Sequence, residues 1–248
     1  MAVRFGPLRA EVTDPESERF TAPLVLVHGL WAGAAVWRRF AGYLAHRGWR
    51  CVALERRADA ELHLAAHADD LDAAIAALDA PPVVVGHDLG ALLALRCAER
   101  ARAVVALAPL VTPPLAAPPQ ALQRAGTWLT RWRGGPLSPP PLGYPLRDRT
   151  EPAALIKQVL AGELPPPSPS GVAPRAVCAV QDDPITALPS ARALADHVGA
   201  ELHVLAGADH CAVLAPGWEA HVAAIHRWII QRLGVDLLAL YDESMQTE

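Results

Sequence analysis

The feature that most constrains the fold is a glycine-bounded segment near the middle of the chain. Residues 86–90 read GHDLG; the apolar run VVV precedes them and the run ALLALR follows them. A short apolar run favours a strand, glycines permit a tight turn, and the second run favours a helix. The segment therefore predicts a strand, a turn and a helix in that order, with Asp88 at the point of the turn.

Strand and helix patterns alternate on both sides of this segment. Short apolar runs predict strands at residues 24–28, 49–54, 103–107, 176–180 and 202–205. Apolar residues at helical spacing predict helices at residues 36–46, 61–78, 190–198 and 216–233. Such alternation is typical of a mainly parallel sheet flanked by helices, so we predict an α/β fold.

The alternation stops between residues 111 and 173, where prolines cluster around two helical patterns, at 120–133 and 152–160. We interpret residues 111–173 as a lid inserted over the sheet; disorder is the alternative for residues 163–174. Residues 1–110 and 174–248 then form one core domain. A chain of 248 residues with 52% hydrophobic content is long enough for one such domain.

The composition argues against several classes of partner. The net charge is −4 and the basic residues are scattered, which is unlike a protein that binds nucleic acid or an anionic membrane. The first residues lack the pattern of a signal peptide, and no uncharged apolar stretch approaches the roughly 18 residues of a membrane helix. We expect a cytoplasmic protein, a monomer or homodimer, that acts on a small molecule.

No cofactor or metal is expected. The chain has no glycine-rich phosphate-binding pattern, and its four cysteines are dispersed singly, so neither a nucleotide nor a disulfide framework is implied. His63 and His67 are four residues apart on a predicted helix, which is the spacing of a metal-binding pair. No third ligand accompanies them, and we interpret them as part of a solvated helix face.

Two further polar residues follow predicted strands downstream of the turn. Asp183 comes after the strand at 176–180, and His210 comes after the strand at 202–205. Both lie at carboxyl ends of strands, and that edge of an open parallel sheet is where ligands bind. Asp182 is a second acidic candidate after the same strand.

These motifs, together with His28-Gly29 after the first predicted strand, resemble the α/β-hydrolase superfamily over nearly the whole chain. Within it the GHDLG segment resembles the branch with an aspartate nucleophile, which comprises epoxide hydrolases, haloalkane dehalogenases and fluoroacetate dehalogenases. The resemblance implies Asp88 as nucleophile, His210 as base and an acid that orients it. The family's acid often precedes a proline, as Asp183 precedes Pro184, so the resemblance favours Asp183 over Asp182. It also implies an oxyanion hole formed by the backbone N–H groups of Leu30 and Leu89.

An aspartate at this position changes which reactions are plausible. A carboxylate is ionised at neutral pH and needs no base to act as a nucleophile. Attack on an sp3 carbon gives an alkyl ester, whereas attack on an ordinary ester would give a reactive anhydride. Esterase or lipase activity is therefore disfavoured, and we expect Asp88 to be alkylated and His210 to activate water against the resulting ester.

The leaving group decides among the substrates of this branch. An epoxide oxygen needs a proton or hydrogen-bond donor, and the predicted lid offers Tyr144, Trp128 and Trp132, although the two indoles also suit simple packing. Leu89 stands where haloalkane dehalogenases usually have tryptophan and fluoroacetate dehalogenases arginine, so we favour an epoxide by elimination. With Trp31 added as a substrate contact, the lid suggests a small to medium, largely apolar substrate.

Three alternatives stay open at this point. Asp88 and His210 could act as an acid/base pair in a cyclase, isomerase or lyase of a biosynthetic pathway. The chain could be a haloalkane dehalogenase-like hydrolase. It could also be an inactive relative that only binds a ligand, because this fold is widely reused.

Overall fold

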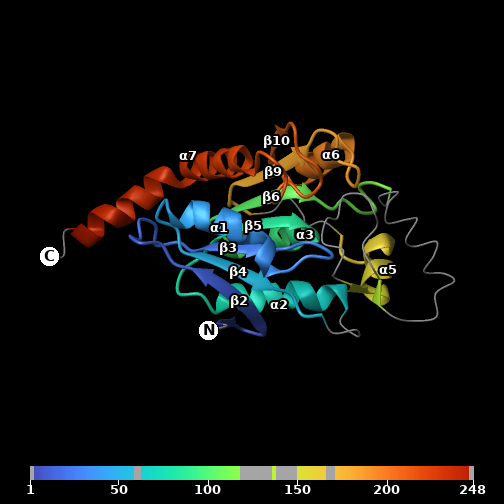
Figure 1. The fold of residues 1–248 in the computed structure, drawn as a ribbon, viewed down its shortest axis with the longest axis horizontal. Coiled ribbons are helices and arrows are strands. Elements are labelled where there is room, and N and C mark those ends of the chain that lie inside the picture. The colour runs from blue at the N-terminus through green and yellow to red at the C-terminus, as the bar shows by residue number, and fades with distance from the viewer. Residues whose placement is uncertain (1–2, 59–62, 118–135, 138–149, 166–170, 246–248) are drawn as a thin grey trace.

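An eight-stranded sheet forms the centre of the computed structural model, which describes residues 3–58, 63–117, 136–137, 150–165 and 171–245 (Figure 1). In chain order its strands are β1 (Val3–Phe5), β2 (Leu8–Thr13), β3 (Leu24–Val27), β4 (Cys51–Glu55), β5 (Val83–Asp88), β6 (Ala103–Pro109), β9 (Arg175–Val180) and β10 (Glu201–Leu205). Their spatial order is β1-β2-β4-β3-β5-β6-β9-β10. From β4 to β10 all neighbours pair in parallel, which confirms the predicted α/β-hydrolase fold.

The first two strands were not expected from the sequence. They form an antiparallel hairpin, and β2 adds to β4 at one end of the sheet. The turn between them contains Gly6, whose φ of 51° lies in the left-handed region that glycine adopts readily. β1 has three residues, so it is too short to give a clear alternating pattern.

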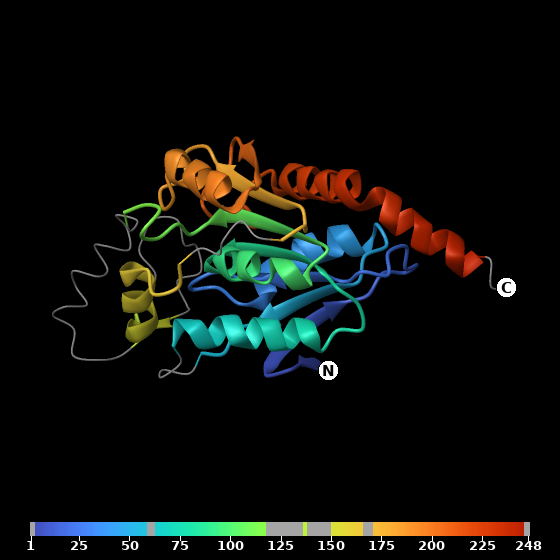
Figure 2. The same ribbon diagram turned by 180° about the vertical axis from the view of Figure 1, so that it is seen from behind.

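Helices cover both faces of the sheet. α1 (Arg38–Ala45), which follows the short 3-10 helix η1 (Ala34–Trp37), and α7 (Trp218–Met245) lie on one face. The other face carries α2 (Leu64–Ala76), α3 (Leu89–Arg96) and α6 (Leu188–Val198), as the reverse view shows (Figure 2). In β3, Leu24 and Leu26 face the first layer while Val25 and Val27 face the second. The strand is buried on both faces, which explains its uninterrupted apolar sequence.

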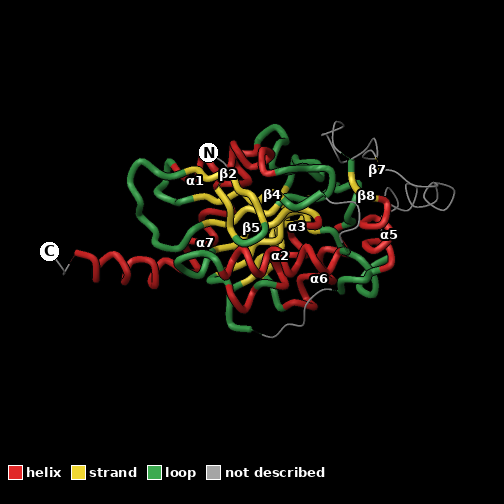
Figure 3. The backbone as a smooth tube through the Cα atoms, turned by 90° about the horizontal axis from the view of Figure 1, so that it is seen from below, coloured by secondary structure: helices red, strands yellow, loops and turns green. Residues whose placement is uncertain are grey.

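The segment predicted to be a lid is described only in part. The predicted helix at 152–160 is confirmed as α5 (Ala153–Ala161), and it contacts α2. Before it, β8 (Glu151–Pro152) pairs with β7 (Pro136–Leu137) at one end of the molecule (Figure 3). The helix predicted at 120–133 lies outside the described residues, and the division into core and lid stays a prediction.

The last helix is longer than expected. The sequence predicts its end at residue 233, but α7 continues through Gly234 to Met245. Its second half extends away from the sheet (Figure 1). Among the described helices none is long and apolar enough to cross a membrane.

One expectation about α2 is wrong. His67 is buried, not on a solvated face, and burial together with the nearby cations of Arg56 and Arg57 lowers its pKa to about 3. His63 is exposed, and its ring lies 2.7 Å from the side-chain amide of Gln158. Across the described parts of the chain, no cluster of three histidine, cysteine or acidic side chains could hold a metal ion.

Candidate active site

Asp88 occupies a strained turn between a strand and a helix. It is the last residue of β5, and α3 begins at the next residue, so the backbone changes from strand to helix at this one position. The φ of Asp88 is 53°, a value that residues other than glycine rarely adopt. Gly86 and Gly90 make the turn possible, because a Cβ on either would overlap backbone atoms of the neighbouring turn or of β3.

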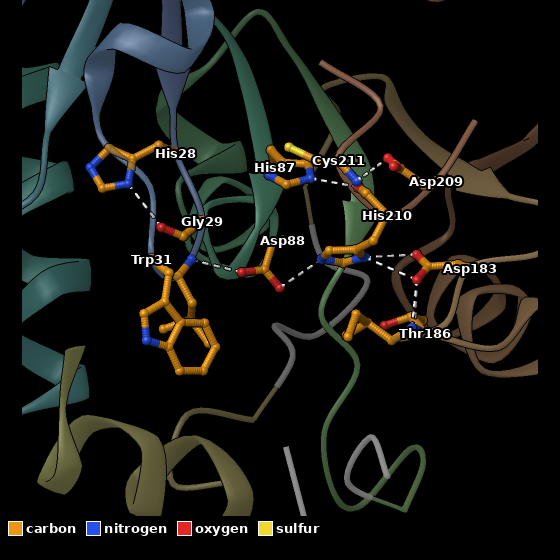
Figure 4. A network of polar contacts seen from close by, with 12 residues as sticks. His28, Gly29, Trp31, His87, Asp88, Asp183, Thr186, Asp209, His210 and Cys211 are labelled. Atoms are coloured by element: carbon orange, nitrogen blue, oxygen red, sulfur yellow. Dashed lines mark hydrogen bonds and ion pairs between the residues drawn. The ribbon is translucent and has the colours of Figure 1, made fainter. Parts of the chain in front are cut away.

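Asp88, His210 and Asp183 form a continuous chain of polar contacts (Figure 4). The Nε2 atom of His210 lies 3.3 Å from Oδ1 of Asp88, and its Nδ1 atom lies 2.8 Å from Oδ2 of Asp183. All three side chains are buried. The backbone N–H groups of Ile185 and Thr186 donate to Oδ1 of Asp183, which fixes that carboxylate toward the imidazole.

The two acidic candidates after β9 are separated by this geometry. Asp183 contacts His210, whereas Asp182 is exposed. Asp209 accepts a hydrogen bond from the backbone N–H of Cys211, as expected for a turn residue. The structure thus brings together the residues predicted as nucleophile, base and acid, and their catalytic roles stay a proposal.

The loop after β3 contacts the other oxygen of Asp88. The backbone N–H of Leu30 donates to Oδ2 of Asp88 over 2.7 Å. Gly29 permits this approach, since a Cβ there would overlap the Asp88 carboxylate. The two oxygens of Asp88 are therefore distinct: one faces the imidazole and the other faces a backbone donor. Leu89, the second predicted donor, follows Asp88 at the start of α3, and its donor role stays a prediction.

The charges of Asp88 and His210 stabilise each other in a buried setting. Burial opposes the charged imidazolium, but hydrogen bonds to Asp183 and Asp88 outweigh it and raise the pKa of His210 to about 10. Burial likewise opposes the Asp88 carboxylate, yet the contact with His210 and the Leu30 N–H keep the pKa of Asp88 below its ordinary value. At neutral pH the pair is therefore a carboxylate and an imidazolium.

His87 supports the loop that carries His210. Its Nε2 atom donates to the backbone carbonyl of His210 over 2.8 Å, and the two rings are 5.2 Å apart. Burial, and next the positive charge of His210, lower the pKa of His87, so its ring is neutral. His87 is therefore a packing residue beside the turn.

The predicted substrate-contacting residues have different outcomes. Trp31 is buried in the same apolar cluster as Leu155 and Ile156 of α5, and its φ is 49°. Trp128, Trp132 and Tyr144 lie outside the described residues. Contact of any of the four with substrate stays a prediction.

A buried ion pair beside the Leu30 loop was missed by sequence reasoning. Nη2 of Arg56 lies 2.6 Å from Oε1 of Glu151, and both side chains are less than a tenth exposed. Arg56 follows β4, and a polar residue at the carboxyl end of a strand was a usable signal. Glu151 stands in a proline-rich stretch whose sequence gave no indication of burial.

Comparison with known proteins agrees with this fold. The model of the alpha/beta hydrolase family matches residues 24–222, which is more than half of the chain, and the chain belongs to that family. The chain therefore has the fold of a hydrolase, with Asp88 at the turn between β5 and α3. No curated protein sequence matches the chain.

Several solved structures share the fold. A monoacylglycerol lipase from Paleococcus ferrophilus is 22% identical, with a TM-score of 0.70 over 91% of this chain and 99% of that one. A thermophilic esterase from Thermogutta terrifontis is 18% identical, with a TM-score of 0.67 over 94% and 99%. An alpha/beta hydrolase fold protein from Burkholderia ambifaria is 21% identical, with a TM-score of 0.64 over 91% and 96%. At these identities the likeness concerns the fold alone.

Proposed function

We propose that this hydrolase opens a small to medium, largely apolar epoxide through a covalent ester on Asp88. The observation that carries the proposal is the division of labour between the two oxygens of one carboxylate. Oδ1 faces His210 and Oδ2 accepts the N–H of Leu30. Oδ1 attacks carbon, so that Oδ2 becomes the carbonyl oxygen of the ester and already has a donor against it.

The alkylation step converts the ion pair into a base. Oδ1 forms a bond to the epoxide carbon, the carbon–oxygen bond breaks, and the electron pair goes to the oxygen. That alkoxide takes up a proton, and the imidazolium of His210 is the source that balances the step, directly or through a lid donor. The products are a neutral ester on Asp88 and a neutral His210, whose pKa is no longer raised by the Asp88 charge.

Hydrolysis returns the site to its starting charges. His210 takes a proton from water, the hydroxide adds to the carboxyl carbon of Asp88, and negative charge collects on Oδ2 beside the Leu30 N–H. Collapse expels the diol oxygen, which takes the proton from the imidazolium. The protonated Asp88 then transfers its proton to His210, and the carboxylate and imidazolium are restored.

The test traps the ester. His210→Ala is incubated with styrene oxide and, separately, with n-butyl bromide, and intact mass and peptide mapping follow the adduct. We expect the mass of one whole epoxide on the peptide that contains Asp88, because water takes the place of the missing imidazolium as proton source, and no adduct in Asp88→Asn/His210→Ala. A butyl adduct without an epoxide adduct would favour dehalogenase-like chemistry. No adduct from a broad panel of epoxides and halides would refute the covalent route.

The same ion pair supports a second candidate, which is proton transfer without an ester. A carboxylate beside a buried imidazolium can remove one proton and deliver another, as an isomerase, cyclase or lyase requires. Deuterium incorporation or rearrangement of a substrate without any adduct in His210→Ala would favour this candidate over hydrolysis.

A further inference from the structure

The loop that presents the Leu30 N–H is held by two residues outside the chain of contacts described above. Nη2 of Arg56 donates to the carbonyl oxygen of Gly29 over 2.9 Å. Oε1 of Glu151 accepts the N–H of Trp31 over 2.9 Å and also the same Nη2 atom. The ion pair thus connects the peptide before Leu30 to the peptide after it.

This arrangement fixes the direction of the Leu30 donor. The carbonyl of Gly29 and the N–H of Leu30 belong to one planar peptide and point in opposite directions. Holding the carbonyl against Arg56 therefore turns the N–H toward Asp88. His28 adds to this hold: its Nε2 atom accepts the backbone N–H of Arg56, so its Nδ1 atom donates to the Gly29 carbonyl.

Glu151 also restrains an unfavourable backbone conformation. A bulky residue with the φ of Trp31, 49°, is a backbone outlier that persists only where its surroundings over-determine it. A charged acceptor on the Trp31 N–H and the burial of its indole supply that restraint. Without Glu151, the peptide after Leu30 loses its charged acceptor, and we expect the Leu30 N–H to turn away from Asp88 with the loop.

We propose that Arg56 and Glu151 are positioning residues that keep the Leu30 N–H on Oδ2 of Asp88. They touch neither Asp88 nor the reacting atoms in any contact described above, and they act through the backbone of residues 29–31. The effect on catalysis rests on the proposed function, but the effect on the Leu30 N–H does not, so the two can be tested apart.

A single NMR signal reports the donor directly. Gly29–Leu30 is the one Gly–Leu sequence in the chain, so carbonyl-13C glycine with 15N leucine labels this peptide alone. We expect a downfield Leu30 amide proton in the wild type and an upfield shift in Arg56→Met and Glu151→Gln. The matched control is Arg57→Met, which removes a neighbouring ion pair with Asp70 and should leave the signal in place.

A double variant separates positioning from stability. A single substitution leaves one buried charge without its partner, which destabilises the fold. Arg56→Met/Glu151→Met removes both charges together and should fold as judged by circular dichroism. If it folds and keeps the wild-type Leu30 shift, the ion pair is only structural and the proposal is wrong. Glu151→Gln is nearly isosteric and offers the same measurement with the smallest change.

Kinetics supply the second readout. Removing an oxyanion donor outright costs about 10²–10³ in turnover; because His28 still holds the Gly29 carbonyl, we expect about a tenfold slower release of the styrene oxide adduct, with little change in KM. Release at the wild-type rate would overturn the proposal. The two proposals can fail separately. If no epoxide or halide alkylates the protein but the Leu30 signal still shifts in the variants, the covalent function is refuted and the positioning role of Arg56 and Glu151 is upheld.

Discussion

Removing the charge of Asp88 should lower the pKa of His210, so that the imidazole is unprotonated nearer neutral pH and can serve as a base. Asp88→Asn keeps the shape of the side chain and removes its charge, as an alkyl ester on Asp88 would. In the unmodified protein, burial opposes the imidazolium, and contacts with Asp183 and Asp88 raise the pKa of His210 to about 10. With position 88 neutral, the contribution of Asp88 to this rise is lost and that of Asp183 remains.

The size of the effect follows from the geometry. The rise from the ordinary 6.5 to about 10 corresponds to about 5 kcal/mol in favour of the imidazolium. An opposite charge at close range accounts for about 1–3 pKa units, and Oδ1 of Asp88 lies 3.3 Å from Nε2 of His210. We therefore expect a pKa of about 7–9 for His210 in Asp88→Asn, so that far more of the imidazole is unprotonated near neutral pH and available to accept a proton from water.

The assay is an NMR titration of 15N-labelled imidazoles in the wild type and Asp88→Asn. His210→Gln assigns the His210 signals among the ten histidines. Asp182→Asn is the matched control, because its side chain is exposed and makes no described contact with the imidazole. An unchanged pKa of His210 in Asp88→Asn would refute the idea that alkylation of Asp88 prepares its own base.

Three further predictions concern the same site. Asp183→Asn should slow ester hydrolysis by about 100-fold or more, because the imidazole loses its anionic partner, whereas Asp182→Asn should leave the rate unchanged. Equal hydrolysis rates for the two variants in single-turnover assays would contradict the assignment of Asp183 as the acid. Gly29→Ala should lower the free energy of unfolding by about 1–3 kcal/mol through overlap with the carboxylate at the turn, whereas Gly42→Ala has open space and should not; urea denaturation compares them. Folded His210 keeps its proton up to about pH 10 but releases it near 6.5 when unfolded, so its stabilising contribution is complete below 6.5 and is lost as pH rises toward 10; a flat stability profile over this range would contradict it.

The sequence predicted the parts of the fold that have a strong local signal. The turn between β5 and α3 is an example, because only glycine at positions 86 and 90 fits the close backbone contacts of this turn. The order of Asp88, Asp183 and His210 then followed from the position of each after a strand. In the hairpin, β1 has too few residues to show a pattern, whereas β2 alternates apolar and polar residues, so its strand was a signal that the sequence reasoning missed.

The ion pair of Arg56 and Glu151 shows why the rest of the site could not be predicted. The two residues are 95 positions apart, and their burial depends on how β8 and α5 dock against the loop after β3. A single sequence contains no periodicity for such a contact. His67 is similar: its spacing resembles a solvated helix face, but packing near Arg56 and Arg57 buries it.

The Leu30 N–H is the contact that favours covalent hydrolysis over simple proton transfer. A donor on Oδ2 lowers the basicity of Asp88, which weakens this carboxylate as a proton acceptor. In ester hydrolysis the same donor faces the oxygen on which negative charge develops, so its contribution grows toward the transition state. The donor on Oδ2 therefore supports the proposed covalent route more than simple proton transfer.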